Sequence, residues 1–74
     1  MKREIRQNGK TILHSDDRMS IKMIFGNLTG RTFQGQKYVE YIRHIAIGSM
    51  GFSPGTIELC RDEEVIGKGK IPNV

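Results

Sequence analysis

The stretch that decides the fold reads Gln36-Lys37-Tyr38-Val39-Glu40-Tyr41-Ile42-Arg43-His44-Ile45-Ala46-Ile47. As a helix it gives one apolar stripe at steps of three and four residues, formed by Tyr38, Ile42, Ile45 and Ser49 and flanked by Tyr41 and Ala46. Its many β-branched and aromatic residues are more typical of a strand. We favour the helix because Glu40, Arg43 and His44 then share a solvent side. Gly48 and Gly51, ahead of Pro54, are helix-stop signals.

Before this stretch, residues 19–25 alternate in polarity. Met19, Ile21, Met23 and Phe25 are separated by Ser20, Lys22 and Ile24. A period of two is typical of a strand with one buried face, so the pattern predicts a central strand here. Three glycines in residues 26–35 then predict a glycine-rich connector between this strand and the helix.

The N-terminal segment carries the strongest local signal, the dipeptide Asn8-Gly9. It favours a type I′ turn, because both central positions need a positive φ. A two-residue turn would place Gln7 opposite Lys10, Arg6 opposite Thr11 and Ile5 opposite Ile12. Neither face of this hairpin is cleanly apolar, so we expect it at a sheet edge or projecting from the core.

The last third of the chain predicts a second hairpin, with residues 56–61 and 64–68 on either side of an acidic turn at Asp62-Glu63. The expected order is hairpin, strand, helix, hairpin. It predicts one α+β domain over residues 1–74, with a small, mostly antiparallel sheet and one helix around 36–47. Should 36–47 be a strand instead, the alternative is a small all-β barrel or ring.

Size and cysteine content limit how this domain is stabilised. A chain of 74 residues buries only about 60% of the surface that it exposes when unfolded. Cys60 is the single cysteine, so a disulfide within the chain is impossible, and no His and Cys cluster resembles a zinc site. Self-association is the remaining route, and a homo-oligomer is therefore a hypothesis. Without the apolar run of a secretory signal or of a membrane span, we expect a cytoplasmic protein.

Catalytic motifs are lacking, and we expect no enzyme, no cofactor and no metal site. Gly9-Lys10-Thr11 resembles part of a phosphate loop, but the glycine required five positions earlier is Glu4. Cys60 has no histidine near it in the sequence and is expected to be a small buried residue. The paired carboxylates lie in predicted turns, where water keeps them ionised.

Charge is distributed unevenly along the chain. Residues 1–37 hold eight Lys or Arg against three acids, a balance of +5, whereas residues 38–74 hold four against five, a balance of −1. Strand side chains two apart share a face and can form basic rows that contact phosphates. The predicted basic surface consists of Arg3, Arg6, Lys10, Lys22, Arg31 and Lys37.

Two function classes follow, and a third is weaker. The first is a small non-enzymatic interaction or regulatory module that binds a larger protein partner, with Met19, Met23 and Met50 as adaptable contact residues. The alternative is a small basic nucleic-acid-binding domain that uses the N-terminal β-surface. The third is an oligomer that sequesters a small anionic ligand beside Arg31 or Lys37.

Overall fold

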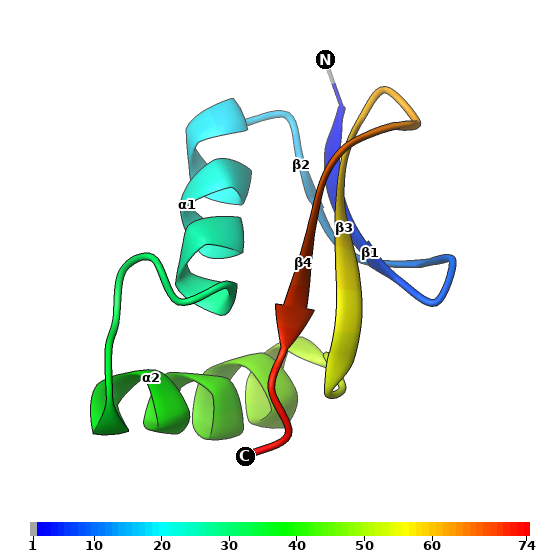
Figure 1. Ribbon diagram of the computed structural model, residues 1–74. Helices are drawn as coiled ribbons and strands as arrows, with labels where there is room; N and C mark the ends of the chain where they lie inside the picture. Colours follow the sequence, from blue (N-terminus) through cyan, green and yellow to red (C-terminus); the bar gives the residue numbers. More distant parts are fainter. Residues whose placement is uncertain (1) are drawn as a thin grey trace.

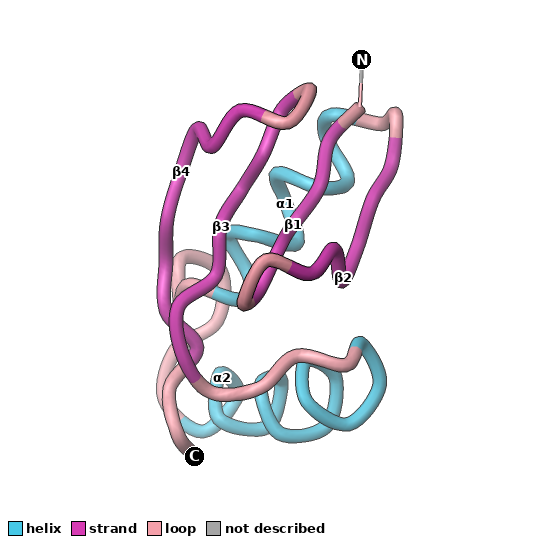
Figure 2. The backbone as a smooth tube through the Cα atoms, turned by 90° about the vertical axis from the view of Figure 1, so that its right-hand side faces the viewer, coloured by secondary structure: helices cyan, strands magenta, loops and turns pink. Residues whose placement is uncertain are grey.

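Two β-hairpins form one antiparallel sheet, and two helical segments cover one face and one end of it (Figures 1 and 2). The computed structural model describes residues 2–74. Its elements are β1 (Arg3–Gln7), β2 (Lys10–Ser15), α1 (Arg18–Leu28), α2 (Gln36–Glu40), a π-helical continuation η1 (Tyr41–Met50), β3 (Gly55–Arg61) and β4 (Glu64–Ile71). The strand order is β2-β1-β3-β4. The α+β prediction is confirmed; the sheet is open, not a barrel or ring.

The N-terminal hairpin turns at Asn8-Gly9, as predicted, with φ of 54° and 75° at the two residues. Gln7 pairs with Lys10 and Arg6 with Thr11, but Ile5 lies opposite Leu13, so the predicted partnership with Ile12 is wrong. A bulge in β2 causes the shift, because one extra residue on that strand moves the register by one. β2 is an edge strand, whereas β1 lies inside the sheet with Ile5 fully buried.

The second hairpin matches its prediction, with Asp62 and Glu63 at the turn in left-handed conformations. β4 also carries a bulge: Leu59 pairs with Gly67 and Cys60 with Val65, which leaves Ile66 as the extra residue. Both edge strands of the sheet are therefore bulged. Bulges disturb the row of backbone groups that an edge offers to other strands, and so they protect an open sheet from edge-to-edge pairing.

The strand predicted for residues 19–25 is wrong, because this segment lies in α1. Asp17 caps the helix: its carboxylate accepts the backbone N–H of Met19 at 3.0 Å and the hydroxyl of Ser20 at 2.7 Å. Ile21 and Phe25, with Leu28 one turn later, pack on the sheet, whereas Met19 and Met23 face solvent. Gly26 lies within the helix as well, so the connector is shorter than predicted.

The helix predicted around 36–47 is confirmed and runs from Gln36 to Met50, through α2 and η1. It crosses one end of the sheet (Figure 1). The buried side chains are Ile42 and Ala46, with Tyr38 and Met50 partly buried, whereas Ile45 from the predicted stripe is 39% exposed. Gly51, with φ of 93°, ends the helix.

The core lies between the sheet, α1 and η1. It contains Ile5, Ile57 and Ile71 from the strands, Ile21, Phe25 and Leu28 from α1, Ile42 and Ala46 from η1, and Phe52 from the following loop. Because α1 covers only one face of the sheet, side chains between its first turns and the strand ends stay within reach of solvent. The candidate site lies there.

Candidate functional site: a basic hollow beside the first helix

Four cationic side chains surround one hollow of about 270 Å³ between α1 and the sheet. Arg18 and Lys22 come from α1, Arg3 from β1 and Arg61 from β3, over apolar walls formed by Ile21, Leu59 and Ile66. We call this set of seven residues the basic hollow. No carboxylate lines it, and so its chemistry is that of an anion site.

Two features of the fold bring these charges together. Arg3 and Arg61 are direct partners across the β1–β3 ladder, so their side chains share the face that α1 covers. Arg18 and Lys22 are four residues apart on α1, which places them on one side of the helix, above those arginines. Helix and strands thus contribute two cations each.

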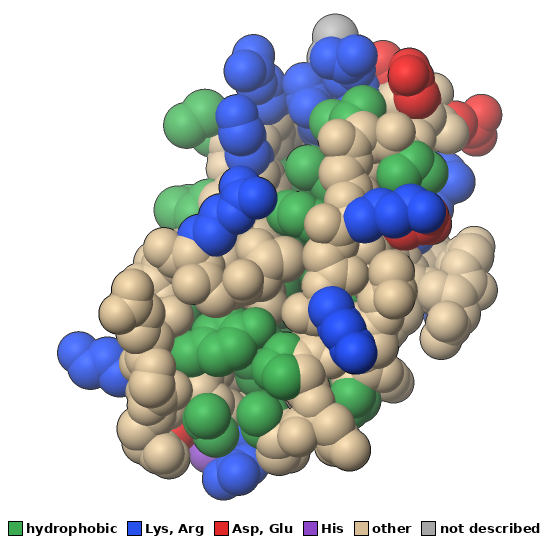
Figure 3. Space-filling view, in the orientation of Figure 1, with side chains coloured by type: hydrophobic (Ala, Val, Ile, Leu, Met, Phe, Trp, Pro, Cys, Tyr) green, Lys and Arg blue, Asp and Glu red, His purple; other side chains and the backbone are tan. Residues whose placement is uncertain are grey.

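The cations of the basic hollow differ in their exposure to solvent. Arg3 is 8% exposed, so its position is fixed by the surrounding protein. Arg18, Lys22 and Arg61 are exposed, and within residues 2–74 none of the three forms an ion pair. Figure 3 shows Lys and Arg side chains gathered over the upper half of this face, whereas Asp and Glu lie mainly at its upper right margin.

The structure brings together only part of the predicted basic surface. Arg3 and Lys22 line the basic hollow, while Lys10 lies at the N-terminal hairpin and Arg31 and Lys37 lie beyond the end of α1. Arg18 and Arg61 were missed. Arg18 could have been found from its four-residue spacing to Lys22, had the helix been predicted. Arg61 had no such signal, since its pairing with Arg3 spans most of the chain.

Arg6 lies on the opposite face of the sheet, where it is bonded to a buried carboxylate. Its guanidinium donates to Glu4 Oε2 at 2.7 Å, and the Thr11 hydroxyl donates to Glu4 Oε1 at 2.7 Å. Lys2 Nζ lies 3.7 Å from the same Oε1. The Thr11 bond, followed by the bond and charge of Arg6, holds the pKa of Glu4 below its ordinary value of 4.5, although burial opposes this. Arg6 is thus part of a structural network.

This network predicts a loss of stability in acid. Because the folded-state pKa of Glu4 is lowered, its carboxylate stabilises the fold above about pH 4.5, and the contribution is lost as pH falls through the folded-state pKa. We expect the free energy of unfolding from urea titrations to decrease between about pH 6 and pH 3. Glu4→Gln should make that decrease smaller. Part of the decrease should remain, because hydrogen bonds with Ser20 also lower the pKa of Asp17, and this carboxylate too loses its stabilising charge in acid. An unchanged pH profile would contradict the assignment.

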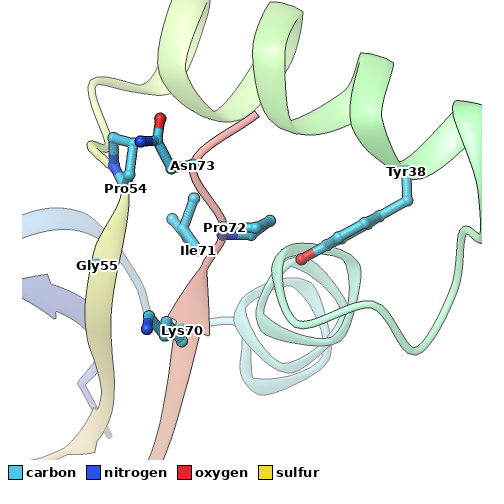
Figure 4. A pocket seen from close by; sticks show the side chains of 7 residues that line it. All are labelled: Tyr38, Pro54, Gly55, Lys70, Ile71, Pro72 and Asn73. Atoms are coloured by element: carbon cyan, nitrogen blue, oxygen red, sulfur yellow. The ribbon is translucent and has the colours of Figure 1, made fainter.

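A second hollow, of about 630 Å³, lies where the helix of residues 36–50 meets the end of β4 (Figure 4). We call it the Tyr38 pocket, and its lining consists of Tyr38, Pro54, Gly55, Lys70, Ile71, Pro72 and Asn73. The Tyr38 hydroxyl donates to the Leu28 carbonyl at the end of α1, at 2.6 Å. Burial raises the pKa of this phenol, so it is neutral and remains a donor at physiological pH.

Other chemistry is sparse in the part of the chain that the structure describes. No group of three His, Cys, Asp or Glu side chains within residues 2–74 is placed to hold a metal ion. Cys60 is fully buried and burial raises the pKa of its thiol, which makes the nucleophilic thiolate scarce. None of the described helices combines the length and apolar character needed to cross a membrane.

Comparison with known proteins gives one match. No curated protein and no solved structure matches the chain. Residues 2–72 match the family described as domain of unknown function DUF7688, so that nearly the whole of the fold described above falls within it. The chain therefore belongs to the DUF7688 family.

Proposed function

We propose that this domain binds nucleic acid without catalysing a reaction, and that the basic hollow contacts the phosphate backbone. The observation that carries the proposal is the convergence of Arg3, Arg18, Lys22 and Arg61 on one hollow without a lining carboxylate. Arginine and lysine provide most of the phosphate contacts in such complexes. A polyanion gains from several cations at once, whereas one small anion would occupy only part of the set.

The test compares two charge-matched double variants. Lys22→Gln with Arg61→Gln removes two cations from the basic hollow. Lys10→Gln with Arg31→Gln removes two exposed cations elsewhere and leaves the same net charge. Binding of a fluorescent oligonucleotide is followed by anisotropy at several salt concentrations, because each phosphate contact contributes about one unit to the slope of log affinity against log salt.

We expect the wild-type slope to drop by about two in the hollow variant and by less than one in the control. Equal losses in both variants would indicate a diffuse net-charge effect and contradict a site. No binding of the wild-type protein at low salt would end the proposal. Circular dichroism of both variants checks that the fold is retained.

A second candidate function is a module that binds a protein partner, and one observation favours it. Met19 and Met23 on the outer side of α1 are 70% and 62% exposed, and flexible methionines are common on adaptable binding surfaces. A Met19→Gln, Met23→Gln double variant should lose partners that the wild-type protein retains from native lysate after nuclease treatment. Retention of the same partners by both proteins would count against this surface.

A further inference from the structure

We infer that the Tyr38 pocket holds an unpaired base of the nucleic acid whose phosphates contact the basic hollow, so that the preferred ligand is single-stranded. This inference rests on the proposed function and adds the class of ligand. Three features of the pocket support it: an immobilised aromatic ring, rigid proline side chains and a lysine. In addition, β4 contributes lining residues to both this pocket and the basic hollow.

The ring of Tyr38 is held in place from two sides. Its backbone belongs to α2, and its hydroxyl is bonded to Leu28 O at the end of α1. The side chain is half-buried, so part of the ring remains open to the pocket. A ring that is already fixed loses little conformational freedom when a base stacks on it, and every base offers a π-face for such stacking.

The end of β4 and the residues that follow it supply most of the pocket lining beside Tyr38. Pro72 projects from the end of β4 toward Tyr38, and Pro54 and Asn73 lie on the other side of the chain that leaves β4 (Figure 4). Proline side chains are rigid and apolar, so Pro72 and the Tyr38 ring offer two apolar surfaces to a flat ligand. Lys70, also on the lining, adds a positive charge that a phosphate would neutralise.

The distance between the two hollows suits a short strand. Ile66 lines the basic hollow and Lys70 lines the Tyr38 pocket, four residues later on β4. At about 3.3 Å per residue these positions are roughly 13 Å apart. That length corresponds to about four stacked nucleotides at ~3.4 Å each, and to fewer in an extended strand. β4 runs from the second hairpin turn toward α2 (Figure 1) and contributes lining residues to both hollows.

A duplex cannot use the Tyr38 pocket, because its bases are stacked and paired. A duplex should therefore bind through the basic hollow alone, as should an oligomer that lacks bases. Single-stranded nucleic acid would gain the stacking contribution, which for one base corresponds to about a tenfold increase in affinity.

The test titrates the full chain at low salt with three labelled probes: a single-stranded octamer, an abasic octamer with the same number of phosphates, and a blunt-ended duplex long enough to stay paired. We expect the wild-type protein to bind the base-bearing single strand about tenfold more tightly than the other two. Tyr38→Leu should abolish that difference and leave the abasic affinity unchanged. Tyr38→Phe keeps the ring and should keep most of the difference.

The outcomes separate the two proposals. Equal affinity of the wild-type protein for the three probes would overturn the base pocket and leave phosphate binding intact. A preference for the single strand that survives Tyr38→Leu would also overturn it. Failure to bind any probe would remove the proposed function itself.

A measurement on the wild-type protein keeps the test decisive even if Tyr38→Leu does not fold. An octamer with 5-iodouracil is photo-crosslinked, and the adducts are mapped by mass spectrometry. Adducts on Tyr38 are the expected result. Adducts confined to residues outside the Tyr38 pocket would contradict the inference.

Discussion

Gly69→Ala should strongly destabilise this domain, whereas Gly67→Ala, the same substitution at the other glycine of β4, should not. Gly69 lies on the side of β4 that faces Phe25 and Thr29 at the C-terminal end of α1. A Cβ at this position would overlap the Thr29 methyl group and lie 3.3 Å from Phe25 Cζ. The Thr29 hydroxyl donates to the Phe25 carbonyl at 2.8 Å, so the Thr29 side chain cannot rotate away without losing that bond. Helix and strand would have to separate.

Overpacking of this kind costs about 1–3 kcal/mol, and we expect a value near the upper end. A domain of this size rarely has more than ~3–5 kcal/mol to lose. At ~4–8 °C per kcal/mol the melting temperature should fall by roughly 15 °C. The measurement is thermal and urea unfolding followed by circular dichroism.

Gly67→Ala is the matched control, on the same strand and the same face. Its Cβ would meet nothing closer than Leu59 Cβ at 3.6 Å, an ordinary contact. Alanine also loses less conformational freedom on folding than glycine, so this variant should be neutral or slightly stabilised. Equal stability of the two alanine variants would contradict the predicted overlap with Thr29 at position 69.

Local signals in the sequence predicted the hairpins and the second helix, but they misassigned the first helix. Ile21 and Phe25 are four residues apart, and a step of four satisfies a strand period of two and a helix period of 3.6 alike. The deciding residues were elsewhere: Asp17 and Ser20 form a cap, and Leu28 continues the helical stripe. Alternation of Met19 and Met23 was misleading, because these side chains are exposed.

The basic hollow could be predicted only in part, for a related reason. The excess charge of residues 1–37 pointed to Arg3 and Lys22, yet an excess along the chain does not say which cations meet in space. Arg61 comes from the half of the chain with a negative balance, and only the β1–β3 register places it beside Arg3. Such a pairing depends on the global fold, as does the bulge that moved Leu13 opposite Ile5.

Gln7→Ala should also be strongly destabilising, because this side chain joins the N-terminal hairpin to the loop that follows η1. Gln7 is 5% exposed. Its amide nitrogen donates to Ser53 O at 2.6 Å, and its amide oxygen accepts from Ser53 N at 2.7 Å. The side chain thus completes both backbone hydrogen bonds of Ser53, as a neighbouring strand would. Loss of two bonds worth ~0.5–1.5 kcal/mol each predicts a decrease of about 2 kcal/mol. Gln34→Ala, at an exposed glutamine, is the control and should have no effect.

Gln7→Glu separates these hydrogen bonds from simple packing. The carboxylate has nearly the same shape and can still accept from Ser53 N, but its second oxygen would face the Ser53 carbonyl and repel it. Protonation restores a donor at that position, so burial of this pair should raise the pKa of the new carboxyl above the usual glutamate value of about 4.3. A raised folded-state pKa means that the variant loses stability as pH rises through that range. The difference in unfolding free energy from the wild-type protein, taken at each pH by urea titration, should therefore be larger at about pH 7 than at about pH 4. A difference that is independent of pH would show that Gln7 acts through its volume and not through the two bonds to Ser53.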